Sequence, residues 1–349
     1  MNRFGFGFGS VNYDEKGVKN KRMNNKFIKI CKLDKNSLKK YLEKELSKYY
    51  KNVISQDGFL YVKGKDKICL TAHMDTVHVN NVVDYYVYKE NNKTIVSSPQ
   101  GIGGDDRCGI YMILTILETT NLRPTIIFCE DEEIGGIGSR KFTNTKFIKD
   151  LKKMYFLIEL DRKGSDDLVY YSDTNSDFHT YLEELTGYQK NFGSFSDISN
   201  LSPACGISSV NISCGYYNAH TTSEYVVMEE MNNSIQTTIK IMEDGLKRKE
   251  QFKYKKREYK PVTSHSDGYD YYTDYFSQYI RKFDDKITLY VQFYEDYDEQ
   301  EEYIKAEDEN EAWTKFFFTH GSVCYNDVID YDVFNDEELE EYLGTDKII

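Results

Sequence analysis

The chain has 349 residues, a net charge of −13 and a mean hydropathy of −0.65. At about 150 residues per domain this length predicts two domains, and the acidic balance argues against nucleic acid or an anionic membrane as a partner. The seven cysteines show no CxxC spacing, which is typical of free thiols in a reducing compartment. No apolar run approaches the roughly 20 residues needed to span a bilayer, so we expect a cytoplasmic protein.

The N-terminal part of the chain predicts an arm, a helix and a hairpin. Residues 1–26 carry Phe-Gly repeats but almost no periodic apolar residues, so we expect a mobile arm. From residue 35 onward apolar side chains recur at helical spacing, with Asp34 or Asn36 available as the helix cap. Residues 53–62 contain an Asp-Gly turn between two short apolar runs and predict a hairpin.

Three short apolar runs end at or just before polar groups and predict buried strands, at residues 68–73, 125–129 and 154–158. Helices are expected between them at 106–118 and, more weakly, at 138–150. This alternation predicts an α/β fold with a mixed, mostly parallel sheet and helices on both faces. Functional groups in such sheets collect at the carboxyl ends of the strands.

The second half of this region predicts a helix at 176–185, a strand at 209–213 and a long helix at 224–249. These elements complete one predicted domain over residues 27–249.

Residues 250–349 differ in composition from the rest of the chain. They hold 26 acidic and 11 basic side chains and 14 of the 31 tyrosines. An alternating segment at 287–294, a possible partner strand at 302–306 and a helical segment at 308–317 predict a small α+β appendage. A solubilising domain and a substrate-selecting domain are equally good interpretations of it.

Five polar side chains occur in the order and chemistry of a two-zinc centre. His73 and His220 offer nitrogen ligands, and Asp105, Glu133 and Asp161 offer oxygen ligands. Three carboxylates and one bridging hydroxide balance the four positive charges of two zinc ions. We therefore expect two Zn²⁺ ions, with Co²⁺ or Mn²⁺ as alternatives.

Two further acids have predicted catalytic roles. Asp75 lies two residues after His73, so on a strand it points the same way and can fix the imidazole tautomer. Glu132 directly precedes Glu133 and lies near the metals without binding them, as a general base does. The remaining histidines are predicted to be non-ligands: His78, His179, His265 and His320.

This ordered set resembles the co-catalytic di-zinc exopeptidases of clan MH, which include peptidase T, glutamyl and tetrahedral aminopeptidases, carboxypeptidase G and single-domain leucyl aminopeptidases. The matching motifs are His73-Met-Asp75, Asp105-Asp106 with Gly109, Glu132-Glu133, Asp161, and His220 before Glu224. The resemblance implies that Asp105 bridges the two metals, that Glu132 is the general base, and that the Asp105–Asp106 peptide bond is cis.

The chain departs from part of that group in one respect. Only 58 residues separate Asp161 from His220, which leaves no room for the lid or dimerisation domain that some relatives insert there. The core therefore resembles the single-domain aminopeptidases, although Ile198 stands where their loop carries a histidine. Without a lid, we expect recognition of the substrate's free α-amino group near Glu132 and the Ser196–Asp197 loop.

The resemblance implies a zinc-dependent exopeptidase, in the first place an aminopeptidase that hydrolyses short peptides through a metal-bridged hydroxide. A zinc amidohydrolase or deacylase of N-acyl amino acids uses the same metal core and stays open. A non-catalytic binding module on the same fold is the alternative from another class, and the complete ligand set argues against it. The expected partner is a short peptide substrate, and the sequence leaves the oligomeric state open.

Overall fold

The computed structural model describes residues 26–193, 195–256, 287–295, 298–306 and 328–335. The chain divides into two compact units between Tyr259 and Lys260. Nearly all of the predicted N-terminal arm, the predicted helix at 308–317, His265 and His320 lie outside the described residues. Among the described helices, none is both long and apolar enough to cross a membrane.

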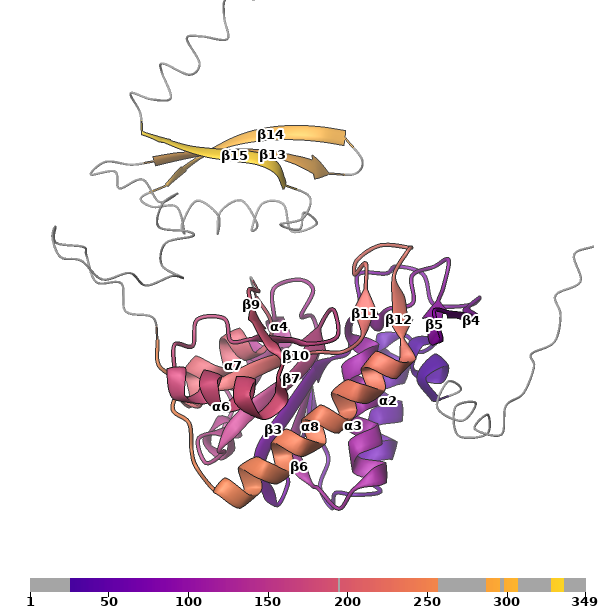
Figure 1. The fold of residues 1–349 in the computed structure, drawn as a ribbon, viewed down its shortest axis with the longest axis vertical. Helices are drawn as coiled ribbons and strands as arrows, with labels where there is room; N and C mark the ends of the chain where they lie inside the picture. Colours follow the sequence, from indigo (N-terminus) through magenta and orange to yellow (C-terminus); the bar gives the residue numbers. More distant parts are fainter. Residues whose placement is uncertain (1–25, 194, 257–286, 296–297, 307–327, 336–349) are drawn as a thin grey trace, which may run out of the picture. The chain divides into compact units, whose positions relative to one another are not determined.

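An eight-stranded sheet forms the centre of the first unit (Figure 1). Its strands are β1 (Ile54–Gln56), β2 (Phe59–Val62), β3 (Asp66–His73), β6 (Pro124–Cys129), β7 (Phe156–Arg162), β8 (Asp167–Val169), β9 (Gln189–Asn191) and β10 (Ser209–Ser213). They follow the order β1-β2-β6-β3-β7-β10-β8-β9, and the central β6, β3, β7 and β10 run parallel. This sheet confirms the predicted fold class.

Helices cover both faces of that sheet. They are α2 (Lys35–Leu46), α3 (Gly104–Thr119), α4 (Ile137–Thr143), α5 (Ile148–Leu151), α6 (Ser176–Thr186), α7 (Ile198–Cys205) and α8 (Met228–Arg248). On one face of the sheet, α2, α3, α6 and α8 share the larger core; α8 is the long orange helix in Figure 1. On the other face, α4, α5 and α7 pack around the smaller core. Leu70 and Ala72 enter the first core and Cys69 enters the second, because successive strand residues point to opposite faces.

Most predicted elements are confirmed, with local differences. Asp34 caps α2 by accepting the Ser37 N–H at 3.0 Å. The segment predicted as one helix at 138–150 forms two, α4 and α5, and the helix α7 was not predicted. The long helix begins at Met228 and not at Glu224, because the three residues before it pair as a strand.

A second, four-stranded antiparallel sheet was not predicted. Its strands are β4 (Tyr86–Glu90), β5 (Lys93–Ser97), β11 (Tyr216–Tyr217) and β12 (Tyr225–Val227), in the order β11-β12-β5-β4. Every residue of β4 is exposed, so its sequence lacks the polar and apolar alternation of a half-buried strand. The loop between β11 and β12 carries His220.

The first unit continues past the last helix. Phe252 is buried in the larger core, where its ring lies 5.0 Å from that of Phe178, and its N–H donates to Tyr155 O at 2.9 Å. Residues 251–256 therefore pack with the first unit. The predicted domain boundary after Lys249 stays a proposal.

The second unit contains a three-stranded antiparallel sheet. Its strands are β13 (Ile287–Glu295), β14 (Asp298–Ala306) and β15 (Val328–Asn335), with β13 in the centre. Ile287 pairs with Ala306, which confirms that the two predicted strands of this segment are partners.

Candidate metal centre

All five predicted ligands converge at one end of the large sheet. His73 is the last residue of β3, Asp161 lies near the end of β7, and Glu133 follows β6. The other two come from outside the strands. Asp105 lies in the first turn of α3, and His220 lies in the β11–β12 loop with a left-handed φ of 65°.

The Asp105 carboxylate lies between the two imidazoles. Its Oδ1 is 3.0 Å from His73 Nε2, and its Oδ2 is 3.3 Å from His220 Nε2. The outer contacts complete two groups, because Asp161 Oδ1 lies 3.5 Å from His73 Nε2 and Glu133 Oε2 lies 3.0 Å from His220 Nε2. One oxygen directed at each histidine is the arrangement expected of a carboxylate that bridges two cations.

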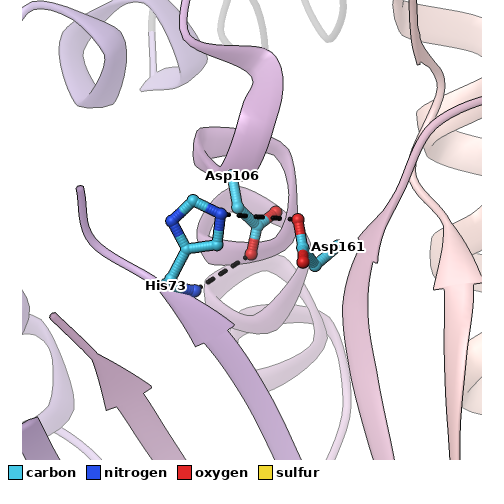
Figure 2. A group of neighbouring side chains, drawn as sticks. All are labelled: His73, Asp106 and Asp161. Carbon is cyan, nitrogen blue, oxygen red and sulfur yellow. Dashed lines mark hydrogen bonds and ion pairs between the residues drawn. The ribbon is translucent and has the colours of Figure 1, made fainter. Parts of the chain in front are cut away.

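Asp106 has a different role from its neighbour, although it also lies close to His73 and Asp161 (Figure 2). Its carboxylate accepts the backbone N–H of His73 at 3.1 Å and that of Gly109 at 2.8 Å. A Cβ at position 109 would approach Asp106 Oδ1 to 2.6 Å, so glycine is required there. Asp106 thus fixes the start of α3 on the end of β3. The Asp105–Asp106 peptide bond is cis, as the resemblance implies.

Asp75 connects two of the predicted segments. Its carboxylate accepts the backbone N–H groups of Glu132 at 3.2 Å and Glu133 at 3.1 Å, and its Oδ1 lies 3.5 Å from His73 Nδ1. Although burial opposes ionisation, the contacts with His73 and with the two N–H groups hold the Asp75 pKa at about 2. Asp75 is therefore placed to orient the imidazole and also holds the Glu132–Glu133 segment.

Several acids of the centre are buried without enough hydrogen-bond donors. Burial, reinforced by the neighbouring Asp105, raises the pKa of Asp161 to about 7. Burial also raises the pKa of Glu132 well above its usual range. Glu133 Oε1 and Asp161 Oδ1 are buried and accept no hydrogen bond from any described residue. Buried carboxylate oxygens of this kind are costly unless a cation pairs with them, so the donor set fits bound metal ions.

The Ser196–Asp197 loop lies beside the predicted ligands, and both of its residues are buried. Ser196 donates its hydroxyl to Asp161 Oδ2 at 2.9 Å and orients that carboxylate. A role of this loop in recognising a substrate amino group stays a proposal. Ile198, at the position of the relatives' histidine, is buried at the start of α7.

Sequence reasoning also missed the partner of His78. Its Nε2 lies 2.8 Å from Glu224 Oε2, a contact between residues 146 positions apart that no local pattern reveals. His179 stacks on Tyr170, with ring centroids 3.8 Å apart, and burial lowers its pKa to about 4. Within the described part of the chain, the hydrogen bonds and ring contacts of these two histidines do not involve the five predicted ligands.

Comparison with known proteins agrees with this geometry. Among solved structures, the aminopeptidase PepT of Bacillus cereus has a TM-score of 0.51 and 16% identity, covering 64% of this chain and 98% of that chain. A tripeptidase of Staphylococcus aureus has a TM-score of 0.52 and 14% identity, covering 65% and 98%. At these identities the likeness establishes the fold.

Sequence comparison is more specific. A probable carboxypeptidase of Aspergillus niger is 27% identical over 111 residues, which are 31% of this chain and 27% of that protein. The chain thus aligns with about a quarter of the length of that curated relative. Residues 21–201, just over half of the chain, match the model of peptidase family M28. This match confirms the predicted resemblance to zinc peptidases: the chain belongs to peptidase family M28.

Proposed function

We propose that this chain is a zinc-dependent exopeptidase, specifically an aminopeptidase that hydrolyses short peptides. The observation that carries the proposal is the position of Asp105, whose carboxylate lies 3.0 Å from His73 Nε2 and 3.3 Å from His220 Nε2. Glu133 and Asp161 flank these contacts, each with a buried oxygen that no described residue satisfies. His73, Asp105, Glu133, Asp161 and His220 would hold two zinc ions.

Bound zinc would supply an acidified water and polarise the scissile carbonyl. The chain's own residues would orient the metal ligands and transfer the proton. Asp75 and Ser196 hold His73 and Asp161 in position. Glu132 is the proposed general base, which takes a proton from the attacking water and returns it to the leaving amine. Burial raises the pKa of Glu132, which makes it a stronger proton acceptor than an exposed glutamate.

The preferred end of the peptide follows from charge. Two zinc ions and a bridging hydroxide would balance the carboxylates of Asp105, Glu133 and Asp161, so Glu132 is the acid of the centre left to attract a protonated α-amino group. The fungal relative is described as a carboxypeptidase and the solved relatives as an aminopeptidase and a tripeptidase. The alternatives are therefore a carboxypeptidase, a deacylase of N-acyl amino acids, or a binding module without activity.

One panel of tripeptides separates these functions: free at both ends, N-acetylated, or C-amidated. The zinc-loaded aminopeptidase should cleave the free and C-amidated peptides and leave the N-acetylated one intact. Loss of cleavage on C-amidation would identify a carboxypeptidase, and release of acetate a deacylase. A zinc-loaded chain that cleaves none of them would support the binding module. The Glu132→Gln variant, purified in parallel, controls for contaminating peptidases.

A further inference from the structure

Glu224 links two segments that carry predicted ligands. It lies four residues after His220 in the loop between β11 and β12, and its N–H donates to Thr221 O at 3.2 Å, which closes a turn in that loop. Its side chain is fully buried. It contacts the start of α3, where Asp105 lies.

Both oxygens of the Glu224 carboxylate are engaged. Oε1 accepts the N–H of Asp105 at 3.0 Å, and Oε2 accepts the N–H of Gly103 at 2.8 Å. His78 Nε2 lies 2.8 Å from the same Oε2. Hydrogen bonds to an ionised carboxylate are about twice as strong as those between neutral groups, so this set of three donors holds its geometry firmly.

The chain before α3 is shaped around this carboxylate and its histidine. Gly103 adopts a left-handed φ of 64°, and a Cβ at Gly104 would lie 3.2 Å from Glu224 Oε1 and 2.8 Å from side-chain atoms of Tyr216 and Val226. A Cβ at Gly101 would lie 2.2 Å from the His78 ring. A larger residue at Gly101 would displace His78, and one at Gly104 would displace Tyr216 and Val226 and press against Glu224.

We propose that Glu224 is a positioning residue of the metal centre. It fixes the backbone of Asp105 against the loop that carries His220, and so sets the distance between the two side chains, whose Oδ2 and Nε2 lie 3.3 Å apart. The inference rests on the proposed function, since it takes Asp105 and His220 as zinc ligands. His78 supports Glu224 through a contact that reaches neither ligand.

The Glu224→Gln variant tests this role in the full chain. Glutamine keeps the shape, but its NH₂ must face at least one N–H group that the carboxylate now accepts. We expect zinc affinity, measured by competition with a chromogenic chelator, to fall about 10- to 100-fold, as is usual when a residue that orients a ligand is changed. The unfolding temperature of the metal-free variant should fall no further than that of the control.

Asp173→Asn is the matched control. Asp173 is also buried and also accepts two backbone N–H groups, those of Asn175 at 3.0 Å and Lys255 at 3.1 Å, neither of which belongs to a predicted ligand. It should lose stability in the metal-free state with zinc affinity unchanged. A Glu224→Gln variant that behaves like this control would overturn the proposal, because its role would then be structural only.

A second variant keeps the test decisive if Glu224→Gln does not fold. His78→Phe retains a ring against Gly101 and leaves the carboxylate in place, but removes one of its three donors. A several-fold loss of zinc affinity is expected, and wild-type affinity would refute the positioning role. The wild-type titration comes first and is read separately, since a wild-type chain that binds no zinc refutes the proposed function itself.

Discussion

The Ser196 hydroxyl donates a hydrogen bond to Oδ2 of Asp161 at 2.9 Å. The other oxygen of that carboxylate, Oδ1, is buried, lies 3.5 Å from His73 Nε2 and accepts no hydrogen bond from any described residue. Ser196 therefore fixes the orientation of the carboxylate while leaving one oxygen directed at the proposed metal position. An arrangement with this many buried acids should be stable only with cations bound or with protons retained.

Removal of metal should abolish hydrolysis and lower the unfolding temperature. Zinc at 100 times its dissociation constant contributes about 2.7 kcal/mol per site to the free energy of unfolding. Dialysis against a chelator removes this contribution, and added zinc, cobalt or manganese should restore both activity and stability. The measurements are thermal unfolding and peptide turnover, with metal content determined on the same samples. Full turnover in a sample shown to be metal-free would contradict the proposed chemistry.

Glu132 and Glu133 should respond in opposite ways to the same substitution. Glu132→Gln should lower kcat by a factor of about 10² to 10⁴ with metal content unchanged, because Glu132 is proposed to move protons and not to bind metal. Glu133→Gln should lose metal, because Glu133 Oε2 lies 3.0 Å from His220 Nε2 within the proposed ligand set. Each variant is the control for the other. If Glu132→Gln loses metal and Glu133→Gln retains it, the two roles are reversed.

The ligand set was accessible from sequence because three of its segments end buried apolar strands. His73 is the last residue of β3, Asp161 lies near the end of β7, and Glu133 follows β6, so the parallel strands bring all three to one edge of the sheet. His220 lies in a loop of the small antiparallel sheet, which the sequence does not predict. The strand β4 in that sheet is exposed along its whole length and shows no alternation.

The supporting contacts were harder to predict for a related reason. Glu224 and His78 pair across 146 residues, and Ser196 reaches Asp161 across 35. Such contacts depend on how the loops fold over the sheet. Neither the periodicity of apolar residues nor the spacing of motifs predicts that arrangement. The burial of Asp197 is likewise not evident from sequence, because an acid in a Gly- and Ser-rich loop is ordinarily exposed.

The metal-free protein should lose stability as pH rises. Burial raises the pKa of Asp161 to about 7 and that of Asp197 to about 6, whereas an unfolded aspartate titrates near about 3.9. Between these values the folded chain binds more protons than the unfolded chain. The contribution of these two acids to the free energy of unfolding is therefore complete below pH about 4 and is lost as pH rises toward 7.

Thermal unfolding in chelator between pH 4 and 7 measures this slope. The zinc-loaded chain should show the opposite slope, because zinc binds only the ionised carboxylates. The Asp197→Asn variant should flatten the metal-free slope, since it removes one of the buried acids with a raised pKa. A metal-free unfolding temperature that rises across the window would show that these acids are ionised in the folded state.

Truncation should separate the two units, provided that the cut spares residues 251–256. A chain ending at Tyr259 retains Phe252, whose ring lies 5.0 Å from that of Phe178 and 5.4 Å from that of Tyr181, and should fold and bind zinc. A chain ending at Lys249 loses this buried ring, and removal of a buried phenylalanine typically costs about 3 to 5 kcal/mol. Circular dichroism, thermal unfolding and zinc titration of the two truncated chains provide the comparison.

Solubility and selectivity should report on the acidic segment itself. Residues 260–349 hold 24 acidic and 7 basic side chains, so removing them changes the net charge from −13 to +4. Solubility should fall because acidic side chains protect against association more effectively than basic ones. If the segment selects substrates, the chain ending at Tyr259 should also change its preference between short and long peptides while zinc affinity stays constant. An insoluble or metal-free product of that length, under conditions where the full chain is sound, would show that the two units share a core.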